Sequence, residues 1–341
     1  MLSKTLIPAI LLLFNIFFIS CDFKKQSVGE FDIIYVFADS SIYNQVSPDI
    51  EQTFDQFIYT PRAEKSFYLQ WEPLEKLNVY KMHKNLLFVG LFNGEDAVSL
   101  YLMKMLSSDV QQAMLEGKIF HIFQEDLFAR DQMSIILFAP NITQLIEYIQ
   151  VYRDDIFTGI EQYHFRRLEK NMFLIEEQKG LEEYLYENFN WTIKVQYEYK
   201  LILQSENGDF VWLKKLRPDR NIFVFKYPAG RFNSTENFLY NLRDSLTTKY
   251  FEGDSIVRDD TDIFKTEFCN NPAWKISGVW KNRKYLLGGP FRTYTFFDHD
   301  SDYQYFIDIS VVAPAVRKKP YLDELEVIAN SFRLNHEKEN K

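Results

Sequence analysis

The sequence predicts an α+β fold made of two similar halves, each with a mostly antiparallel sheet covered by helices. Short apolar runs typical of buried strands alternate along the chain with stretches of helical apolar spacing. Of the 341 residues, 46% are hydrophobic and 17% aromatic, so the chain can bury a large core, and its length favours two domains. Runs of strands joined by tight turns and followed by helices favour sheets with helices on one side.

The first half predicts four strands and four helices. The strands share a short apolar run that ends at turn-forming residues: 31–38, 85–92, 118–126 and 132–138. The helices share apolar side chains spaced three or four residues apart: 49–58, 96–116, 142–168 and 171–187. The polar join near residue 188 is the predicted boundary between an N-terminal domain of residues 31–188 and a C-terminal domain of residues 189–335.

The second half predicts more strands than the first. Asn207-Gly208 marks a tight hairpin turn between two of them. The predicted strands are 192–203, 209–216, 221–227, 274–280, 285–297 and 303–312. The predicted helices are 235–249, preceded by Ser234, and 320–332, opened by Pro320. A turn-rich insert is expected after the first of these helices.

The two halves also share an order of segments. "NLLFVGLF" and "NIFVFKYP" are each followed by a helix, as are "SIILFAPN" and "DISVVAPA". This order is compatible with an internal duplication whose second copy carries an insertion around residues 251–290. The alternative is that any α+β chain shows such alternation, so the duplication remains a hypothesis.

The N-terminus has the layout of a bacterial lipoprotein signal. Lys4 precedes an apolar stretch that is too short for a comfortable membrane span, and Ser20-Cys21 fits a lipobox, although Phe18 stands where leucine is usual. We expect residues 1–20 to be removed, Cys21 to carry the lipid, and residues 21–30 to form a polar tether. The alternative is an ordinary signal peptide with a chance cysteine. The outer membrane, facing the periplasm, is the expected location, with surface display left open.

Charge and cysteine content exclude several classes of function. The formal net charge of −9 makes nucleic acid an unexpected partner, because phosphate binding needs a basic face. With Cys21 lipidated, Cys269 is the other cysteine, so an intramolecular disulfide is not expected. The histidines lack neighbouring ligands at metal spacing, and no cofactor motif is present, so neither a metal nor a cofactor is expected.

The densest candidate binding region lies between Gly278 and Tyr294. Adjacent glycines before a proline permit close approach of a ligand, and the nearby aromatic rings offer stacking faces for a sugar or peptide backbone. The favoured alternative is that these glycines shape a curved strand. Trp212 and the charged pair Arg243 and Asp244, which lie in neighbouring segments, are added to this region. The candidate binding residues are then Trp212, Arg243, Asp244, Trp280, Tyr285, Gly288, Gly289, Pro290, Phe291 and Tyr294.

Catalytic signatures are weak. Asp298 opens a run of alternating carboxylates, but Tyr303 and Ile309 stand where a calcium loop needs glycine and glutamate, so a solvated hairpin is expected. Asp244 and Ser245 are adjacent on a predicted helix, which is the wrong spacing for direct activation of the hydroxyl, and no nucleophile elbow is present. An enzyme is therefore not indicated, although it is not excluded.

The second half resembles an uncharacterised lipoprotein family of the Bacteroidetes, domain of unknown function 4837. The segments that carry the resemblance are "GDFVWLKK", "NLRDSLTTKYFEG", "GVWKNRKYLLGGPFRTYTFFD" and "VVAPAVRKKPYLDELEVIANSF". The layout of residues 31–170 is similar more loosely. The resemblance implies a lipid-anchored envelope protein and supplies no reaction.

Two interpretations of the function follow. The preferred one is a non-enzymatic binding or assembly module of the cell envelope, with an envelope protein or glycan as partner and a membrane attachment through Cys21. The alternative is an envelope hydrolase acting on glycan or peptide, with Asp244 and Asp298 as acid and base. A pair of carboxylates about 5–9 Å apart in one cleft would favour the hydrolase, and an aromatic groove without converging titratable groups would favour the binding module.

Overall fold

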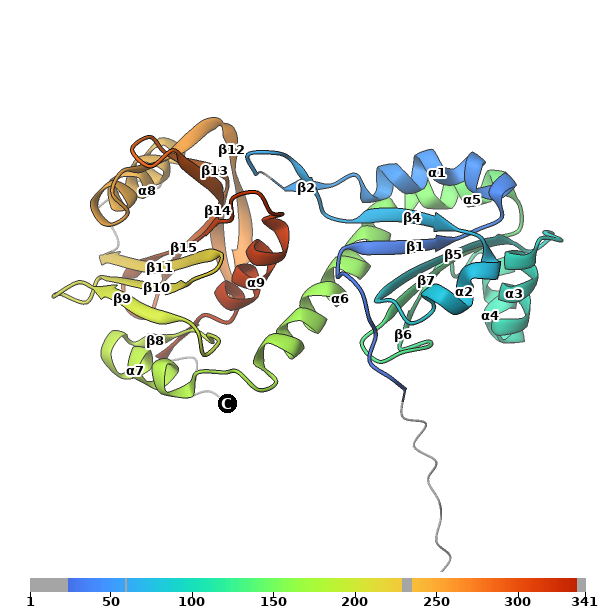
Figure 1. Ribbon diagram of the computed structural model, residues 1–341, viewed down its shortest axis with the longest axis horizontal. Helices are drawn as coiled ribbons and strands as arrows, with labels where there is room; N and C mark the ends of the chain where they lie inside the picture. The colour runs from blue at the N-terminus through green and yellow to red at the C-terminus, as the bar shows by residue number, and fades with distance from the viewer. Residues whose placement is uncertain (1–23, 59, 229–234, 336–341) are drawn as a thin grey trace, which may run out of the picture.

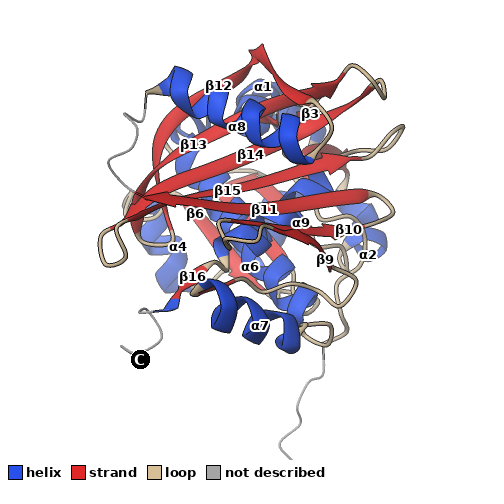
Figure 2. Cartoon of the chain, turned by 90° about the vertical axis from the view of Figure 1, so that its left-hand side faces the viewer, coloured by secondary structure: helices blue, strands red, loops and turns tan. Residues whose placement is uncertain are grey.

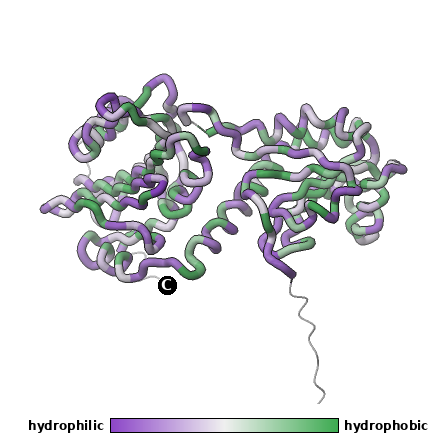
Figure 3. The backbone as a smooth tube through the Cα atoms, viewed as in Figure 1, coloured by the Kyte–Doolittle hydropathy of each residue, from purple (hydrophilic) through white to green (hydrophobic). Residues whose placement is uncertain are grey.

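The computed structural model describes residues 24–58, 60–228 and 235–335, which form two domains lying side by side (Figure 1). The predicted signal peptide and Cys21 lie outside the described residues. None of the helices in the described ranges is long and apolar enough to cross a membrane. The α+β class is confirmed, and Figure 3 shows hydrophobic residues, in green, along the central strands of the N-terminal domain.

The N-terminal domain contains a five-stranded sheet in the order β4-β1-β5-β7-β6. Its strands are β1 (Ile33–Phe37), β4 (Tyr68–Glu72), β5 (Asn85–Leu91), β6 (His121–Glu125) and β7 (Met133–Ala139). β1 pairs in parallel with β4 and β5, and β5 pairs in parallel with β7, whereas β6 runs antiparallel to β7. The expectation of a mostly antiparallel sheet is therefore wrong for this domain. β5 and β7 are buried on both faces, as parallel strands covered by crossover helices usually are.

Helices cover both faces of this parallel sheet. One face packs against α1 (Ser40–Phe54), α5 (Ile142–Val151) and α6 (Arg153–Phe173). The other packs against α2 (Leu77–Tyr80), α3 (Ala97–Met105) and α4 (Ser108–Leu115). Asp39 begins α1 and Asp96 begins α3 by accepting hydrogen bonds from backbone N–H groups of the first turn.

The expected tether is partly built into this domain. Gln26 forms a parallel bridge with Arg130, and Val28 forms one with His83. The hydroxyl of Ser27, which is buried, donates to the carbonyl of Asp131 at 2.9 Å. Lys25 also belongs to the domain edge, because its carbonyl oxygen accepts from the backbone N–H of Arg130 at 2.8 Å.

The C-terminal domain contains a seven-stranded antiparallel sheet in the order β12-β13-β14-β15-β11-β10-β9. Its strands are β9 (Lys200–Gln204), β10 (Phe210–Lys215), β11 (Asp219–Pro228), β12 (Asp254–Phe268), β13 (Asn271–Asn282), β14 (Leu287–Asp298) and β15 (Tyr303–Val312). The insert that was expected to be turn-rich forms the long hairpin of β12 and β13 instead. The strand expected over 192–203 is also divided, because β8 (Trp191–Thr192) pairs with β16 (Arg333–Leu334) in a separate sheet.

The two faces of the C-terminal sheet carry different helices. α8 (Glu236–Tyr250) packs on one face, which we call the α8 face and which Figure 2 views from the front. α7 (Lys179–Phe189) and α9 (Lys319–Asn330) pack on the opposite face, the α9 face. α7 thus packs with the C-terminal core, although the sequence placed it before the boundary at residue 188. A parallel sheet in one half and an antiparallel sheet in the other give no support to the predicted duplication.

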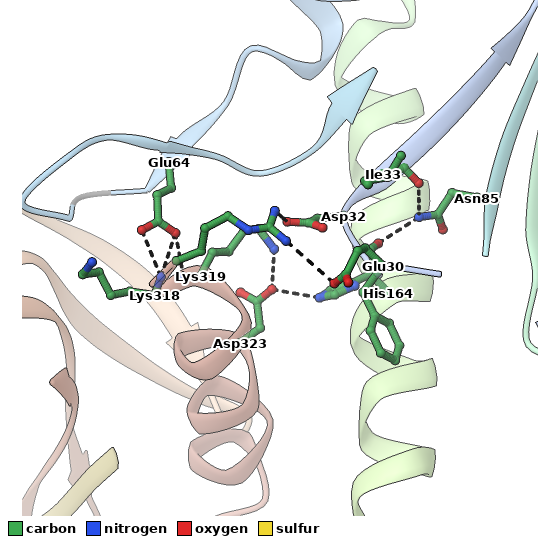
Figure 4. A network of polar contacts seen from close by, with 11 residues as sticks. Glu30, Asp32, Ile33, Glu64, Asn85, His164, Lys318, Lys319 and Asp323 are labelled. Atoms are coloured by element: carbon green, nitrogen blue, oxygen red, sulfur yellow. Dashed lines mark hydrogen bonds and ion pairs between the residues drawn. The ribbon is translucent and has the colours of Figure 1, made fainter. Parts of the chain in front are cut away.

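A short arm from the N-terminal domain reaches the C-terminal domain. The arm is the hairpin of β2 (Phe57–Ile58) and β3 (Glu64–Lys65). Both carboxylate oxygens of Glu64 accept from the backbone N–H of Lys318 at 2.9 Å, and one also accepts from that of Lys319 (Figure 4). The first turn of α9 is thereby capped by a side chain of the other domain.

Two further contacts join the domains beside this arm. Arg317 donates to the carboxylate of Asp32 at 2.5 Å, and His164 on α6 lies 2.9 Å from the carboxylate of Asp323 on α9 (Figure 4). Together with the Glu64 cap, they fix α9 against the N-terminal domain. The α8 face of the C-terminal sheet therefore points away from this domain interface.

Candidate functional site

A pocket of about 240 Å³ opens on the α8 face, beyond the C-terminal end of α8. We call it the aromatic pocket. Side chains from six strands, from the end of α8 and from the β13–β14 turn line it: Trp212, Lys214, Asp219, Asn221, Tyr250, Phe251, Glu252, Asp254, Trp280, Asn282, Tyr285, Leu287 and Val312. Three of the residues predicted from the sequence, Trp212, Trp280 and Tyr285, lie in it together.

The register of the sheet explains why these side chains meet. Alternate residues of a strand point to the same face, so Trp280 and Asn282 of β13 both face α8. Asp254 of β12 pairs with Asn282, and Gly289 of β14 pairs with Trp280. The position next to Trp280 on this face is thus a glycine, which has no side chain to pack against the indole.

Gly289 is required by close approach of the backbone. A Cβ atom at this position would lie 1.9 Å from the carbonyl oxygen of Val311 and 3.3 Å from the indole nitrogen of Trp280. A side chain at position 289 would clash with this carbonyl oxygen unless β15 moved away. The glycine therefore serves the shape of the sheet, and it also leaves room for the indole nitrogen of Trp280.

Trp280 carries an unused hydrogen-bond donor. The residue is 3% exposed, and its Nε1 has no hydrogen-bond partner among the described residues. An indole N–H can only donate, and a buried donor without an acceptor is costly. Trp212 differs, because its Nε1 donates to the side-chain oxygen of Asn221 at 3.2 Å. A residue that lines the pocket thus carries a buried donor without an acceptor among the described residues.

The aromatic wall is held by ring contacts at the end of α8. Trp212 packs on Phe251 with ring centroids 4.4 Å apart, and Tyr250 stacks on Phe210 at 3.8 Å. Tyr285 stands at the rim with 49% of its surface exposed, and its hydroxyl donates to the carboxylate of Glu252. The inner rings are therefore fixed, and Tyr285 presents an accessible ring.

Each carboxylate of the pocket already has a partner. Asp219 pairs with Lys214 at 2.6 Å, and Glu252 pairs with Lys284 at 2.7 Å. Asp254 accepts from the side-chain amide of Asn282 at 2.7 Å. Burial raises the pKa of Asp254 above its ordinary value, although this amide and the charge of Arg243 oppose the rise. This arrangement suits binding better than acid–base catalysis by two free carboxylates.

Three other predicted residues lie on the α8 face but beneath or along α8. Arg243 is 1% exposed; its Nε donates to Asp308 at 2.7 Å, and its guanidinium lies 3.7 Å from the ring centroid of Phe291. The carboxylate of Asp244 accepts from the backbone N–H of Ile256 at 2.8 Å. Arg243 and Asp244 thus attach α8 to the sheet, and neither lines the pocket.

The remaining predicted residues belong to the other face. Gly288, Pro290 and Tyr294 alternate with Gly289 along β14, so they point toward α9. The hydroxyl of Tyr294 donates to the buried carboxylate of Glu326, and its ring stacks on that of Phe268 at 4.2 Å. The suggestion that Tyr294 offers a stacking face to the same ligand as Trp280 is therefore wrong.

The sequence did not identify several residues of the pocket. Tyr250 and Phe251 follow the predicted helix, and Asp254 and Asn282 meet only because β12 and β13 form one hairpin. The alternation of apolar and polar side chains along residues 254–268 was the sequence pattern that could have predicted this hairpin. It was weak, because a bulge shifts the register between Val257 and Thr261.

The predicted hairpin loop at Asp298 is a turn between β14 and β15. Its carboxylate accepts from the backbone N–H of Asp300 at 3.2 Å and from the hydroxyl of Ser301. Among the described residues, no group of three or more histidine, cysteine or acidic side chains is arranged to hold a metal ion. Asp298 contacts its own turn, whereas Asp244 contacts the backbone of β12.

Two family models match successive parts of the chain. Residues 178–331 match the family described as Domain of unknown function (DUF4837), and residues 27–173 match another, Domain of unknown function (DUF8532). The family recognised in the sequence is thus supported for the C-terminal domain. The looser resemblance of residues 31–170 to that family is replaced by a match to a second one. No curated protein sequence matches the chain.

Solved structures match parts of the chain at low similarity. A Bacteroides thetaiotaomicron structure shares 7% identity over 42% of this chain and 45% of its own, with a TM-score of 0.27. LpqN of Mycobacterium tuberculosis, described as involved in cell envelope biogenesis, shares 12% over 42% of this chain and 82% of its own, with a TM-score of 0.29. The Saccharomyces cerevisiae Ran-binding protein Mog1p shares 11% over 43% and 90%, with a TM-score of 0.28. At these scores the similarities carry no functional argument.

Proposed function

We propose that this chain, whose C-terminal domain belongs to the DUF4837 family, is a non-enzymatic binding module of the cell envelope. It is anchored by a lipid on Cys21 and binds its ligand in the aromatic pocket. The observation that carries the proposal is the pocket itself, a concave surface of about 240 Å³ whose lining includes the aromatic side chains of Trp212, Trp280 and Tyr285.

The anchor places the N-terminal domain close to the membrane. Three residues separate Cys21 from Lys25, whose carbonyl oxygen accepts a hydrogen bond from the backbone N–H of Arg130 in the domain. A fully extended residue spans at most about 3.6 Å, so this linker reaches no more than roughly 14 Å. The C-terminal domain with its pocket is carried on the far side of the domain interface, where it can meet ligands in the surrounding compartment.

Binding is favoured over hydrolysis by the state of the acidic side chains. The pocket carboxylates are held by Lys214, Lys284 and Asn282, as described above. The pair that the hydrolase interpretation requires, Asp244 and Asp298, is engaged in separate contacts with β12 and with the β14–β15 turn. The hydrolase remains the alternative, with Asp254 as its best-placed acid because burial raises the pKa of that residue.

Native mass spectrometry of the mildly purified protein tests the pocket. We compare the wild type with Tyr285→Ala, which removes an exposed ring from the rim of the pocket. Trp274→Phe is the control, because Trp274 lies on the same strand and face as Trp280 but outside the pocket. We expect envelope extract to add a bound mass to the wild type and to the control, and not to Tyr285→Ala. Absence of any bound mass on the wild type would reject the proposal.

Fractionation of cells tests the anchor separately. Cys21→Ala is expected to move the protein from the membrane fraction to the soluble fraction, because two or three acyl chains are needed for stable attachment. Cys269→Ala is the matched control and is expected to leave the distribution unchanged. Continued membrane association of Cys21→Ala would contradict the lipid anchor without bearing on the pocket.

A further inference from the structure

We infer that the ligand of the aromatic pocket carries a primary ammonium group, which pairs with the carboxylate of Asp254 among the aromatic side chains of the lining. The inference rests on the proposed binding function and adds the chemical class of the ligand. Three features support it: a carboxylate without a cationic partner, aromatic rings that are held in place, and lysines at the rim that already make the expected contacts.

Asp254 differs from the other two carboxylates of the lining, which pair with lysines as described above. No ion pair joins Asp254 to a cation among the described residues, and its side chain accepts instead from the neutral amide of Asn282 at 2.7 Å. Arg243 acts on Asp254 electrostatically, but this guanidinium donates to Asp308 at 2.7 Å. The pocket therefore holds one negative charge that a ligand can pair with.

This charge decides which class of ligand binds. A neutral ligand that displaced water from Asp254 would leave a partly buried carboxylate without compensation, and burial already raises the pKa of this side chain. A phosphate or carboxylate would be repelled by Asp254 and Glu252. Lys214, the one cation among the described lining residues, is already paired with Asp219. An ammonium group instead donates to Asp254, which has acceptor sites left beside the one that Asn282 uses.

The rings of the lining are placed to contact a cation. Trp212 donates from Nε1 to Asn221 at 3.2 Å and packs on Phe251, so its ring is held by two neighbours. Tyr285 presents a half-exposed ring at the rim. The face of an aromatic ring is negative and attracts ammonium groups, more strongly where water is excluded. The lining thus combines a carboxylate with ring faces, as sites for organic cations do.

Two lysines outside the lining show these contacts within the chain itself. Lys284 Nζ lies 2.7 Å from the carboxylate of Glu252 and 4.6 Å from the ring centroid of Tyr285. Lys249 Nζ lies 4.6 Å from the ring centroid of Tyr250. Both rings and Glu252 belong to the lining. An ammonium group is therefore already held at the rim by a carboxylate and a ring, and Asp254 offers the same combination at a less exposed position.

The volume of the pocket limits the group that enters it. About 240 Å³ is smaller than the roughly 300–1,000 Å³ typical of sites for drug-sized ligands. An ammonium group on a short chain or on a single small ring fits this space. A free amine and the lysine side chain of a partner protein both present such a group, so the experiment probes both.

The test uses the full-length lipidated protein in a non-ionic detergent at pH 7. Benzylammonium, benzyl alcohol and benzoate share one ring and nearly one size and differ in charge. Nα-acetyl-lysine methylamide and its norleucine counterpart present the same comparison on a peptide unit. Saturation-transfer NMR detects binding, and calorimetry gives Kd. We expect at least one ammonium probe to bind at least tenfold more tightly than its uncharged counterpart, and benzoate to bind more weakly than benzylammonium.

The order of the two ammonium probes identifies the source of the group. Tighter binding of the lysine probe supports a partner protein as the source, and tighter binding of benzylammonium supports a free amine. The inference is overturned if neither ammonium probe binds up to about 20 mM, or if neither binds more tightly than its uncharged counterpart.

Variants show whether the ammonium group pairs with Asp254. Asp254→Asn removes the charge and keeps the shape of the side chain, so it should weaken binding of the ammonium probe at least about tenfold. Asp259→Asn is the matched control, because Asp259 is an exposed carboxylate on the same strand outside the pocket, and it should leave the affinity unchanged. Equal affinity of the wild type and Asp254→Asn would overturn the inference.

Unchanged thermal unfolding of Asp254→Asn confirms that the variant folds, and the comparison of probes on the wild type does not depend on it. Failure of this inference is distinguishable from failure of the proposed function. If native mass spectrometry detects a Tyr285-dependent ligand that is neutral or anionic, the binding module stands and the ammonium class is wrong. If the wild type carries no pocket ligand from envelope extract, the proposed function itself fails.

Discussion

His164 Nε2 lies 2.9 Å from Asp323 Oδ2 and joins α6 of one domain to α9 of the other. Their side chains are 3% and 4% exposed, and Asp323 also pairs with Lys319 within α9. Burial lowers the pKa of His164, and the hydrogen bond to Asp323 only partly opposes this. Burial alone would raise the pKa of Asp323, but Lys319 and His164 hold it below its ordinary value. In the folded protein His164 is therefore neutral, and it donates a hydrogen bond from Nε2 to the ionised carboxylate of Asp323.

Acid should weaken this interface. The pKa of His164 is lower in the folded state than its ordinary value of 6.5, so below pH 6.5 the unfolded chain binds more protons than the folded one. The free energy of unfolding then falls as the pH drops, by at most about 1.4 kcal/mol per pH unit for one group. Asp323 adds a loss of the same sign at lower pH, below its ordinary pKa of 3.8.

Urea unfolding at pH 7.5 and 5.5 measures this effect. The wild type is expected to lose more stability between these pH values than His164→Gln, which cannot take up the proton. His299→Gln is the control, because His299 lies in the exposed β14–β15 turn. Equal pH dependence of wild type and His164→Gln would show that folding does not lower the pKa of His164.

Glu64→Ala should loosen α9 from the N-terminal domain. Lys318 at the start of α9 provides no side-chain cap, and Glu64 supplies one from β3 by accepting from two backbone N–H groups. Loss of such a cap costs about 0.5–2 kcal/mol. We expect faster hydrogen exchange in the first turn of α9 in Glu64→Ala, and a smaller effect in Glu64→Gln, which retains one acceptor.

Lys65→Ala is the matched control for this prediction. Lys65 lies on the same arm, and its partner Asp55 is 3.1 Å away at an exposed position. Exposed ion pairs contribute about 0–1 kcal/mol, so the exchange of α9 should not change. If Glu64→Ala exchanged like the wild type, the arm would not hold the domains together.

The sequence identified aromatic residues of the pocket but not the set as a whole. Trp212, Trp280 and Tyr285 were recognised as candidates, and they meet because strands far apart in sequence pair in one sheet. Tyr294 was included because it is near in sequence, but alternation along β14 sends it to the other face. Which face a strand residue occupies depends on register, and a bulge such as that in β12 shifts it without a clear sequence signal.

The parallel sheet of the N-terminal domain was missed for a related reason. The run 85–91 is apolar throughout and is buried on both faces, as is 133–139. Such runs predict a strand but not the direction of its partners. The connections through α1 and α3 permit parallel pairing, and it is the burial of both faces that indicates it. The α+β class was predictable because helix and strand periodicities are local.

Arg243→Met should destabilise the C-terminal domain strongly. Arg243 and Asp308 are each 1% exposed and paired at 2.7 Å, so the substitution leaves a buried carboxylate without its cation. Breaking such a pair costs about 3–5 kcal/mol. Burial raises the pKa of Asp308, and Arg243 opposes this rise, so the variant raises it further. The Arg243→Met variant should therefore lose more stability as the pH rises above 3.8, the ordinary pKa of an aspartate side chain.

The double variant Arg243→Met/Asp308→Asn tests the cause. It removes the unpaired charge, so it should be more stable at pH 7 than Arg243→Met alone in thermal or urea unfolding. Arg258→Met is the control, because Arg258 pairs with Asp244 at 3.4 Å on the surface and should lose less than about 1 kcal/mol. A double variant less stable than the single one would indicate that the two side chains contribute by packing and not by charge.

Gly289→Ala and Gly180→Ala should change stability in opposite directions. A Cβ at Gly289 would lie 1.9 Å from the carbonyl oxygen of Val311, whereas one at Gly180 in α7 has no atom within 4 Å. We expect Gly289→Ala to lose about 1–3 kcal/mol, as overpacked sites do. Gly180→Ala should gain up to about 1 kcal/mol, because alanine is the better helix former. Urea unfolding of both variants at pH 7 measures the difference.

The result at Gly289 also separates the two explanations of that glycine. If the residue serves the shape of the sheet, the alanine variant is destabilised even without any ligand, because β15 must move away from β14. If the residue only leaves room for a ligand, the free protein keeps its stability and loses affinity alone. The 1.9 Å approach of the Val311 carbonyl predicts the first outcome. Because the Trp280 indole lies over the same position, that movement should also weaken ligand binding in the aromatic pocket.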